Sequence, residues 1–231
     1  MKKIFTLIAV AAMTLAANAQ KTWDFTATPA DVVTALDAKV AAGDWKFADP
    51  RYHNAVDVPG ETDLGTYLGY AAWEGLKVSA KNGGAIGISS GTGRLRINKD
   101  MYMQINASNA YFILTGLKAG DEITFKATSA NATAERDVTL ANATVKEGGA
   151  TTFKVAGSES GVTEATLVVT ADGDVTLTQS GGMNVSYIGV TSSTAITNVN
   201  ANDNAKAAPA KVIKGGKLYI GNYNAAGQQV K

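Results

Sequence analysis

Cysteine is absent from this chain of 231 residues, and His53 is its only histidine. Without thiols the chain has no disulfide, no thiolate metal site and no cysteine nucleophile. A single histidine excludes a metal site built on two histidines, and no glycine cluster forms a phosphate loop that leads into a helix. The sequence therefore identifies no reaction.

Long apolar runs are also scarce, and the only one stands at the start of the chain. Lys2 and Lys3 form a positive end, Ile4 to Ala12 an apolar centre, and Ala17 to Ala19 a small-residue cleavage site before Gln20. This order is typical of a secretory signal peptide, and the run is short for a transmembrane helix. No cysteine follows the site for a lipid anchor. We expect residues 1–19 to be removed and the mature protein to be exported and soluble.

A strong excess of charge of one sign is missing as well. The mature chain would hold 19 basic and 20 acidic residues, which gives no field for holding nucleic acid. The charge is unevenly distributed, because five lysines and no acidic residue lie from Lys206 to Lys231. The preceding part has 14 basic and 20 acidic residues, a net charge of −6. An acidic body with a basic tail indicates two segments with different tasks.

The stretch from Tyr111 to Thr128 shows the pattern that dominates the rest. An apolar run and an alternating run flank a connection with Gly116 and Gly120, which predicts a strand, a turn and a strand paired as a hairpin. Ile123 and Phe125 would point to one face and their neighbours to the other. About ten such short strands, with no alternating helices and no fixed repeat, favour an all-β, two-sheet antiparallel sandwich, jelly-roll-like, over a parallel sheet or a β-helix.

The predicted sandwich domain covers residues 20–190 and begins with a strand around Trp23. One short helix is expected between Pro29 and Gly43, where apolar residues recur at helical spacing, and it would cover one end or face of a sheet. Residues 191–210 are expected to be a linker, and 211–231 a small β tail. Further strands are predicted at Trp73–Ala80, Ala85–Ser89, Arg94–Asn98, Met101–Asn106, Asp137–Ala141, Thr151–Val155, Glu164–Thr170, Asp174–Ser180 and Asn184–Val190.

Residues 44–68 show no sustained period, so we expect a long irregular loop, a kind that is often functional. Sugar recognition needs flat aromatic faces, with amides and carboxylates at the rim. Within or beside this region the candidate ligand-binding residues are Arg51, Tyr52, His53, Asn54, Asp57, Tyr67 and Tyr70. Trp45 and Trp73 could add aromatic faces, but tryptophan is mostly buried in small domains, which favours the core for both. Tyr52 and His53 are expected to be exposed.

Acidic residues elsewhere are predicted to lie in turns. Asp172-Gly173-Asp174 resembles part of a calcium loop but lacks the further acids, and Asp-Gly between strands is typical of a hairpin turn. Asp121 and Glu122, at a strand entrance, are expected to be solvated. We assign no cofactor and no metal ligands. A calcium ion bracing the sandwich remains an alternative that the sequence does not place.

The end of the chain resembles the carboxy-terminal sorting tails of type IX secretion in Gram-negative bacteria. The resemblance covers about a tenth of the chain and rests on Val212 to Gly216, Leu218 to Ile220 and Tyr223 to Gln228. Only Gly221-Asn222 separates the last two segments, where such tails usually have a second turn. The resemblance implies that the partner of the tail is the secretion machinery, and that the protein is secreted or held at the outer cell surface.

The body resembles galactose-binding-type, carbohydrate-binding β-sandwich modules of secreted bacterial proteins. The residues that carry this are Trp23 to Thr26, Arg94 to Gln104, Gly116 to Asp121 and Ser186 to Val190. This resemblance implies a non-catalytic module that binds polysaccharide or glycan. The alternatives are a structural or adhesive surface protein that binds protein partners, and a small polysaccharide lyase or hydrolase that uses acids of the irregular region.

Overall fold

The computed structural model describes residues 20–49, 52–87, 94–98, 102–106, 108 and 110–193, together with the backbone of three short strands near the end of the chain. The chain divides into two compact units, Met1–Ala195 and Ile196–Lys231. The expected signal peptide and most of the expected linker lie outside the described residues. The division into domains therefore stays a prediction.

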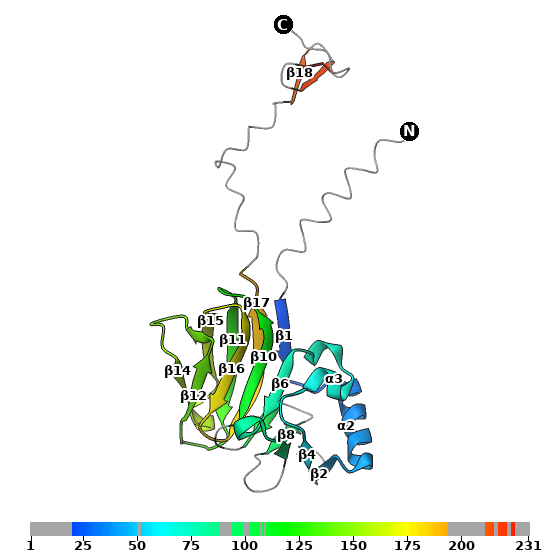
Figure 1. Cartoon of the computed structure of the whole chain (residues 1–231), viewed down its shortest axis with the longest axis vertical. Helices are drawn as coiled ribbons and strands as arrows, with labels where there is room; N and C mark the ends of the chain where they lie inside the picture. The colour runs from blue at the N-terminus through cyan, green and yellow to red at the C-terminus, as the bar shows by residue number, and fades with distance from the viewer. Residues whose placement is uncertain are drawn as a thin grey trace. The chain divides into compact units, whose positions relative to one another are not determined.

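Two antiparallel sheets stack face to face in the first unit, which confirms the all-β sandwich (Figure 1). The larger sheet has nine strands in the order β13-β15-β11-β17-β9-β8-β3-β2, with β1 also beside β17. Its strands are β1 (Gln20–Asp24), β2 (Trp45–Asp49), β3 (Tyr52–Ala55), β8 (Leu95–Asn98), β9 (Tyr102–Ile105), β11 (Glu122–Ser129), β13 (Ala143–Val145), β15 (Thr163–Val169) and β17 (Met183–Thr191).

The smaller sheet has six strands in the order β14-β12-β16-β10-β6-β5. They are β5 (Thr62–Asp63), β6 (Leu76–Ser79), β10 (Tyr111–Leu117), β12 (Arg136–Ala141), β14 (Thr152–Val155) and β16 (Gly173–Gln179). A separate two-stranded ladder joins β4 (Asp57–Val58) to β7 (Ile86–Gly87). Most of these strands follow the predicted ranges, although β6 begins later than expected because Trp73 lies in a 3-10 turn.

The core lies between the sheets and is built by side-chain alternation. In β11, Ile123, Phe125 and Ala127 are buried while the residues between them are partly exposed. Trp45 and Trp73 are also fully or almost fully buried, so they belong to the core. Aromatic side chains of this size contribute much of the apolar surface that folding removes from water.

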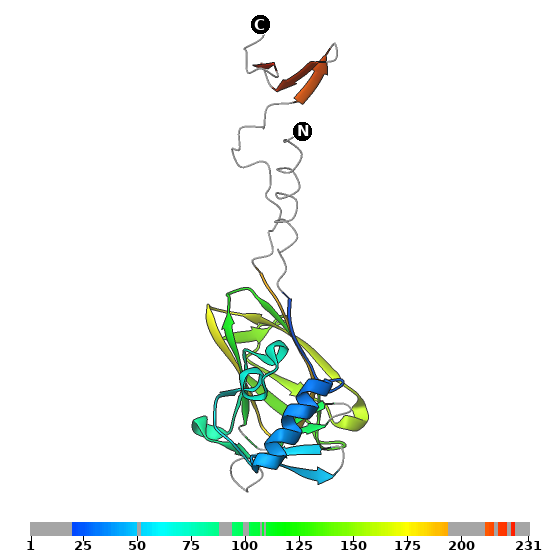
Figure 2. The ribbon, with the colours of Figure 1, turned by 90° about the vertical axis from the view of Figure 1, so that its right-hand side faces the viewer.

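The predicted helix is present as α2 (Ala30–Ala42). Pro29 occupies the N-cap, and Gly43 ends the helix in the left-handed conformation at φ +87°. Val32 and Leu36 are buried. The helix lies across the outside of the domain near β2, with the short α3 (Leu64–Leu68) on the same side (Figure 2).

The predicted hairpin at Tyr111–Thr128 is wrong in its pairing. β10 pairs with β6 and β16 in the smaller sheet, whereas β11 pairs with β15 and β17 in the larger sheet. The connection crosses from one sheet to the other, and the same holds for the Asp172-Gly173 connection between β15 and β16. Both strands turn an apolar face to the same core. Two consecutive strands can do this as neighbours in one sheet, as in a hairpin, or as members of two sheets that face each other.

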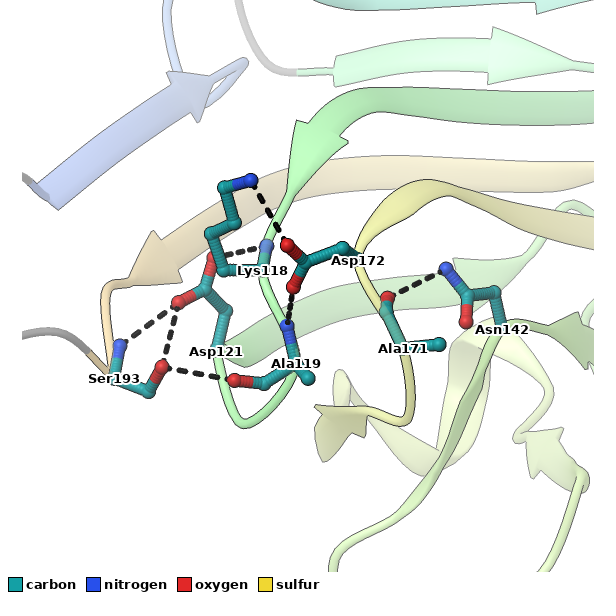
Figure 3. A network of polar contacts seen from close by, with 7 residues as sticks. All are labelled: Lys118, Ala119, Asp121, Asn142, Ala171, Asp172 and Ser193. Carbon is teal, nitrogen blue, oxygen red and sulfur yellow. Dashed lines mark hydrogen bonds and ion pairs between the residues drawn. The ribbon is translucent and has the colours of Figure 1, made fainter.

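Asp121 is not solvated as predicted but is 4% exposed. Figure 3 shows its carboxylate accepting hydrogen bonds from the Lys118 backbone N–H at 2.8 Å and from the Ser193 N–H at 2.8 Å and Oγ at 3.2 Å. Asp172 accepts from the Ala119 N–H at 3.0 Å and from Lys118 Nζ at 3.0 Å, and these groups lower its pKa. The two carboxylates thus fix the β10–β11 connection to the end of β17 and to the β15–β16 connection.

Residues 44–68 do not form the expected irregular loop. They fold into β2, β3, β4, β5 and α3, which are two to five residues long. Elements this short show no period in the sequence, and two buried polar residues of β3, His53 and Asn54, interrupt the apolar pattern. In the second unit, β18 (Lys211–Lys214), β19 (Lys217–Ile220) and β20 (Tyr223–Asn224) form a separate three-stranded antiparallel sheet.

Candidate functional site: a groove beside Tyr70

The predicted ligand-binding residues are only partly brought together at the surface. Arg51 lies outside the described residues, and of Tyr52 only the backbone, in β3, is described. Asp57, in β4, is exposed. Tyr67 at the end of α3 and Tyr70 just beyond it are half-buried.

His53 is not exposed as predicted: the residue is buried, at 1% exposed. Its Nε2 lies 2.8 Å from Oδ1 of Asp37 on α2, and its ring lies 4.9 Å from that of Phe47. Asn54 is also buried and accepts a hydrogen bond from Arg96 Nε at 2.7 Å. These contacts give His53 Nε2 and Asn54 Oδ1 the partners that buried polar atoms require, and they fix α2 and β8 to β3. His53 Nδ1 is buried and has no hydrogen-bond partner among the described residues.

The hydroxyl group and the ring of Tyr67 also contact other side chains of the protein. Trp45 Nε1 donates to its hydroxyl at 3.3 Å, and Lys39 Nζ lies 4.0 Å from the centre of its ring. The lysine covers one face of the ring in a cation–π contact. Tyr67 therefore closes the space between α2 and α3.

Tyr70 lines an open groove. The groove has a volume of about 240 Å³ and is bordered by residues 22–29 on one side and by the Tyr70–Trp73 turn on the other. Its lining residues are Thr22, Asp24, Thr26, Ala27, Pro29, Tyr70, Ala72 and Trp73.

An aromatic stack connects Tyr70 to the core. Its ring lies 5.7 Å from that of Trp73 at 86°, and Trp73 lies 5.0 Å from Phe25 at 68°. Both are edge-to-face contacts, the arrangement that aromatic pairs prefer. Since Trp73 and Phe25 are almost fully buried, the stack holds the Tyr70 ring in one position at the surface.

The short helix α3 sets the backbone position of Tyr70. Asp63 caps the helix by accepting from Thr66 N–H at 2.9 Å, and its other oxygen accepts from Gly75 N–H at 2.6 Å. At the other end Gly69 is left-handed at φ +68°, and Tyr70 N–H donates to Gly65 C=O at 2.8 Å. One carboxylate thus ties the helix to the turn that follows Tyr70.

Asp24 places a carboxylate in the same groove. Its Oδ1 accepts from Thr26 N–H at 2.8 Å and from Thr26 Oγ at 2.6 Å, which fixes the side chain. No described residue hydrogen-bonds its Oδ2, and Asp24 is exposed. The groove therefore combines a fixed aromatic ring with a fixed carboxylate that has one oxygen open to a ligand.

A second cleft lies at one edge of the sandwich, where β14 of the smaller sheet faces β13 and β15 of the larger. Its volume is about 720 Å³, and Phe153 forms part of its wall. The Phe153 ring packs edge-to-face on Phe125 at 5.8 Å. Ion pairs hold both lysines of the rim: Lys146 pairs with Glu122 at 2.8 Å, and Lys154 pairs with Asp137 and Glu135, which together raise the Lys154 pKa.

The described residues hold no group of three or more histidine, aspartate or glutamate side chains placed to bind a metal ion. Within the same residues, no helix is long and apolar enough to cross a membrane.

No protein-family model matches the chain, and no curated protein matches it. Solved structures with a weak likeness include a family two carbohydrate esterase from Cellvibrio japonicus, at a TM-score of 0.33 and 12% identity over 61% of this chain and 33% of the esterase. The chain thus spans about a third of that enzyme's length.

Two further structures are carbohydrate-binding modules. One is a xylan-binding module, CBM15, with a TM-score of 0.33 and 14% identity over 52% of this chain and 92% of the module. The other is a CBM36 module in complex with calcium and xylotriose, with a TM-score of 0.28 and 20% identity over 45% and 84%. At these values the similarity does not assign this chain to a family, and no ligand is transferred from it.

Sequence reasoning missed Asp24 and Thr26 as candidates. The segment Trp23-Asp24-Phe25-Thr26 reads as a strand whose aromatic residues point inward. The same alternation turns Asp24 outward, so the pattern contained this signal. That Tyr70 lies opposite was not readable, because the two segments are distant in the chain.

Proposed function

We propose that this protein is an exported, non-catalytic module that binds glycan through the groove beside Tyr70. The observation that carries the proposal is the pairing in one groove of a half-buried tyrosine ring with the open carboxylate oxygen of Asp24. A tyrosine ring covers the apolar face of a sugar, and a carboxylate accepts hydrogen bonds from its hydroxyl groups.

Part of the predicted contact surface lies in the groove. Tyr70 is the member of the predicted set that lines it, and Asp57 remains exposed on β4. His53, Asn54 and Tyr67 would act behind the surface by holding α2 and α3 in place. The volume, about 240 Å³, suits a single sugar unit rather than a whole oligosaccharide.

The groove chemistry favours binding over catalysis. Glycoside hydrolysis uses a pair of carboxylates on either side of the scissile bond. Asp24 is the one carboxylate among the residues that line the groove. No cofactor is part of the proposal, and a calcium ion bracing the sandwich stays an expectation without a placed site.

The groove is tested by replacing Tyr70 with alanine. We expect the apparent dissociation constant for a retained polysaccharide to rise at least about tenfold, because an aromatic contact of roughly 1.4 kcal/mol is lost. Affinity electrophoresis and titration calorimetry on a panel of soluble polysaccharides measure this. Tyr111→Ala is the matched control, since Tyr111 is also a half-buried tyrosine but lies on β10 of the smaller sheet.

Three outcomes would contradict the proposal of a non-catalytic module that binds glycan in this groove. Absence of retention on every polysaccharide, with binding to host matrix proteins instead, would favour the structural or adhesive alternative. Retention that survives Tyr70→Ala but is lost in a Glu147→Ala/Lys154→Ala variant would move the site to the edge cleft, whose rim holds both residues. Release of product from any polysaccharide would revive the lyase or hydrolase alternative.

Export forms the second part of the proposal. We propose that residues 1–19 act as a signal peptide and that residues 211–231 act as a type IX sorting tail, so that the protein is secreted or held at the outer surface of a Gram-negative cell. The basic tail is supported as a separate piece by its own three-stranded sheet and by its place in a separate compact unit.

Deleting Lys211 to Lys231 is expected to trap a folded body inside the cell envelope. Fractionation of cells that express the full chain or the truncated chain, followed by immunoblotting, measures the distribution. Limited proteolysis of the trapped body serves as the control for folding. Arrival of the truncated protein in the medium or on the cell surface in normal amounts would show that the tail has no sorting role.

A further inference from the structure

The outer face of the larger sheet carries an ordered grid of side chains next to the groove. Pairing places Asp24 of β1 and Lys126 of β11 on the two sides of Tyr187 of β17. One row further along, Thr22 and Thr124 lie on the two sides of Gly189. The residues between these positions on each strand, such as Trp23, Ile188 and Phe125, are buried, so the grid faces outward.

The hydroxyl end of the Tyr187 ring packs over Gly189 on this face. A Cβ added to Gly189 would lie 2.5 Å from the Tyr187 Oη and 2.7 Å from its Cε1. The ring therefore occupies the space that a side chain at position 189 would take. Lys126 Nζ lies 5.6 Å from the centre of the ring, and Tyr187 is half-buried, so part of the ring stays accessible.

The ring and the groove beside Tyr70 share their border. Thr22 and Asp24 line the groove, and the same two residues are the cross-strand neighbours of Gly189 and Tyr187. Tyr70 and Tyr187 thus lie on opposite sides of β1. With about 4.8 Å between neighbouring strands, the distance from β1 to β11 adds roughly 10 Å of surface to the groove.

The charges on this surface favour a neutral ligand. Lys126 is paired with Glu164 of β15 at 3.0 Å, and Asp24 already accepts two hydrogen bonds. The part of the chain before the tail is acidic, with a net charge of −6 for the mature form, and it would repel a chain of sugar acids. Threonine hydroxyls and a single open carboxylate oxygen match sugar hydroxyl groups, which both donate and accept.

We propose that Tyr187 forms a second sugar subsite and that the ligand is an extended, uncharged polysaccharide chain. The chain enters the groove beside Tyr70, crosses β1 at Thr22 and Asp24, and stacks a further sugar on the Tyr187 ring above Gly189. This inference rests on the proposed glycan binding and names the class of glycan.

The test compares a disaccharide with a hexasaccharide of the same neutral polysaccharide by titration calorimetry. In the wild-type protein the hexasaccharide should bind at least about tenfold more tightly, because only the longer ligand reaches both rings. Tyr187→Ala should remove this gain and leave disaccharide binding unchanged. Tyr70→Ala should weaken the binding of both ligands.

A second variant tests whether binding depends on the position of the Tyr187 ring and not only on its presence. Gly189→Ala retains Tyr187 but forces its ring away from the sheet, and the ring is the free end of a flexible side chain, so the fold should be kept. It should lose the hexasaccharide gain as Tyr187→Ala does. Thermal unfolding near the wild-type temperature, for both variants, shows that the loss is local.

The outcomes separate this inference from the proposed function. Equal hexasaccharide gain in the wild type, Tyr187→Ala and Gly189→Ala would overturn the second subsite while glycan binding through Tyr70 stands. Tighter binding of an oligogalacturonate than of neutral hexasaccharides would overturn the uncharged class. Absence of binding to any oligosaccharide would overturn the proposed function and this inference with it.

Discussion

Replacing Asp121 with alanine is expected to lower the free energy of unfolding by roughly 2–4 kcal/mol, since it removes a buried carboxylate that accepts three hydrogen bonds. Two of the donors are backbone N–H groups, of Lys118 and Ser193, and these would lose their acceptor. The loss should open the end of β17 from the β10–β11 connection (Figure 3). Urea unfolding followed by tryptophan fluorescence measures the change.

The adjacent carboxylate is the matched control. Glu122 follows Asp121 as the first residue of β11, but the hydrogen bonds of Glu122 go to Lys146 Nζ, and both of these side chains are about half exposed. A surface ion pair of this kind contributes at most about 1 kcal/mol, so Glu122→Ala should change stability little. Equal losses for the two variants would show that Asp121 is no more than a surface acid. Asp121→Asn should lose an amount of stability between those of Asp121→Ala and Glu122→Ala, because it keeps one acceptor oxygen.

The sequence was sufficient for elements whose signal is local. Pro29 and Gly43 set the ends of α2, and the spacing of Val32 and Leu36 sets its buried side. The alternation of Ile123 and Phe125 gave the strand and its inward face. Each of these signals lies within the element that it describes, so no knowledge of the partner was needed.

The pairing partners of the strands could not be predicted from the sequence, because the same alternation occurs in a hairpin and in strands that cross between two sheets. β10 and β11 each bury an apolar face in one core, and only long-range pairing shows that the faces belong to different sheets. His53 shows the same limit for the site. Its burial depends on Asp37, 16 residues away on α2, and a histidine beside polar residues reads as exposed until that partner is placed.

The sequence indicated the region of the candidate site but not most of the residues that form it. Tyr70 was among the predicted residues and lines the groove. Asp24 and Tyr187, in contrast, come from the first and the last strand of the sandwich in sequence order. Their neighbourhood follows from the pairing of β1 with β17. Gly189 shows the same point, since its role is visible only when the ring of Tyr187 is placed above it.

Substituting Gly65 with alanine should disturb both the fold and the groove. Gly65 is buried in α3, and a Cβ there would overlap backbone atoms, the Glu74 N and the Trp73 carbonyl carbon. A flexible side chain can move aside, but backbone cannot, so α3 must shift away from the turn that it packs against. Overpacking of this kind costs roughly 1–3 kcal/mol of unfolding free energy. Thermal and urea unfolding measure the loss.

The same shift should weaken glycan binding, because the Gly65 carbonyl accepts the Tyr70 N–H at 2.8 Å and Trp73 supports the Tyr70 ring. Thr66→Ala is the control one residue along: its side chain is exposed, and the backbone N–H that Asp63 caps is retained. It should stay within about 0.5 kcal/mol of the wild type and bind normally. If Gly65→Ala keeps wild-type stability and affinity, then close contact between α3 and the Trp73 turn does not position Tyr70, and the rigidity of the groove must come from the Trp73–Phe25 stack alone.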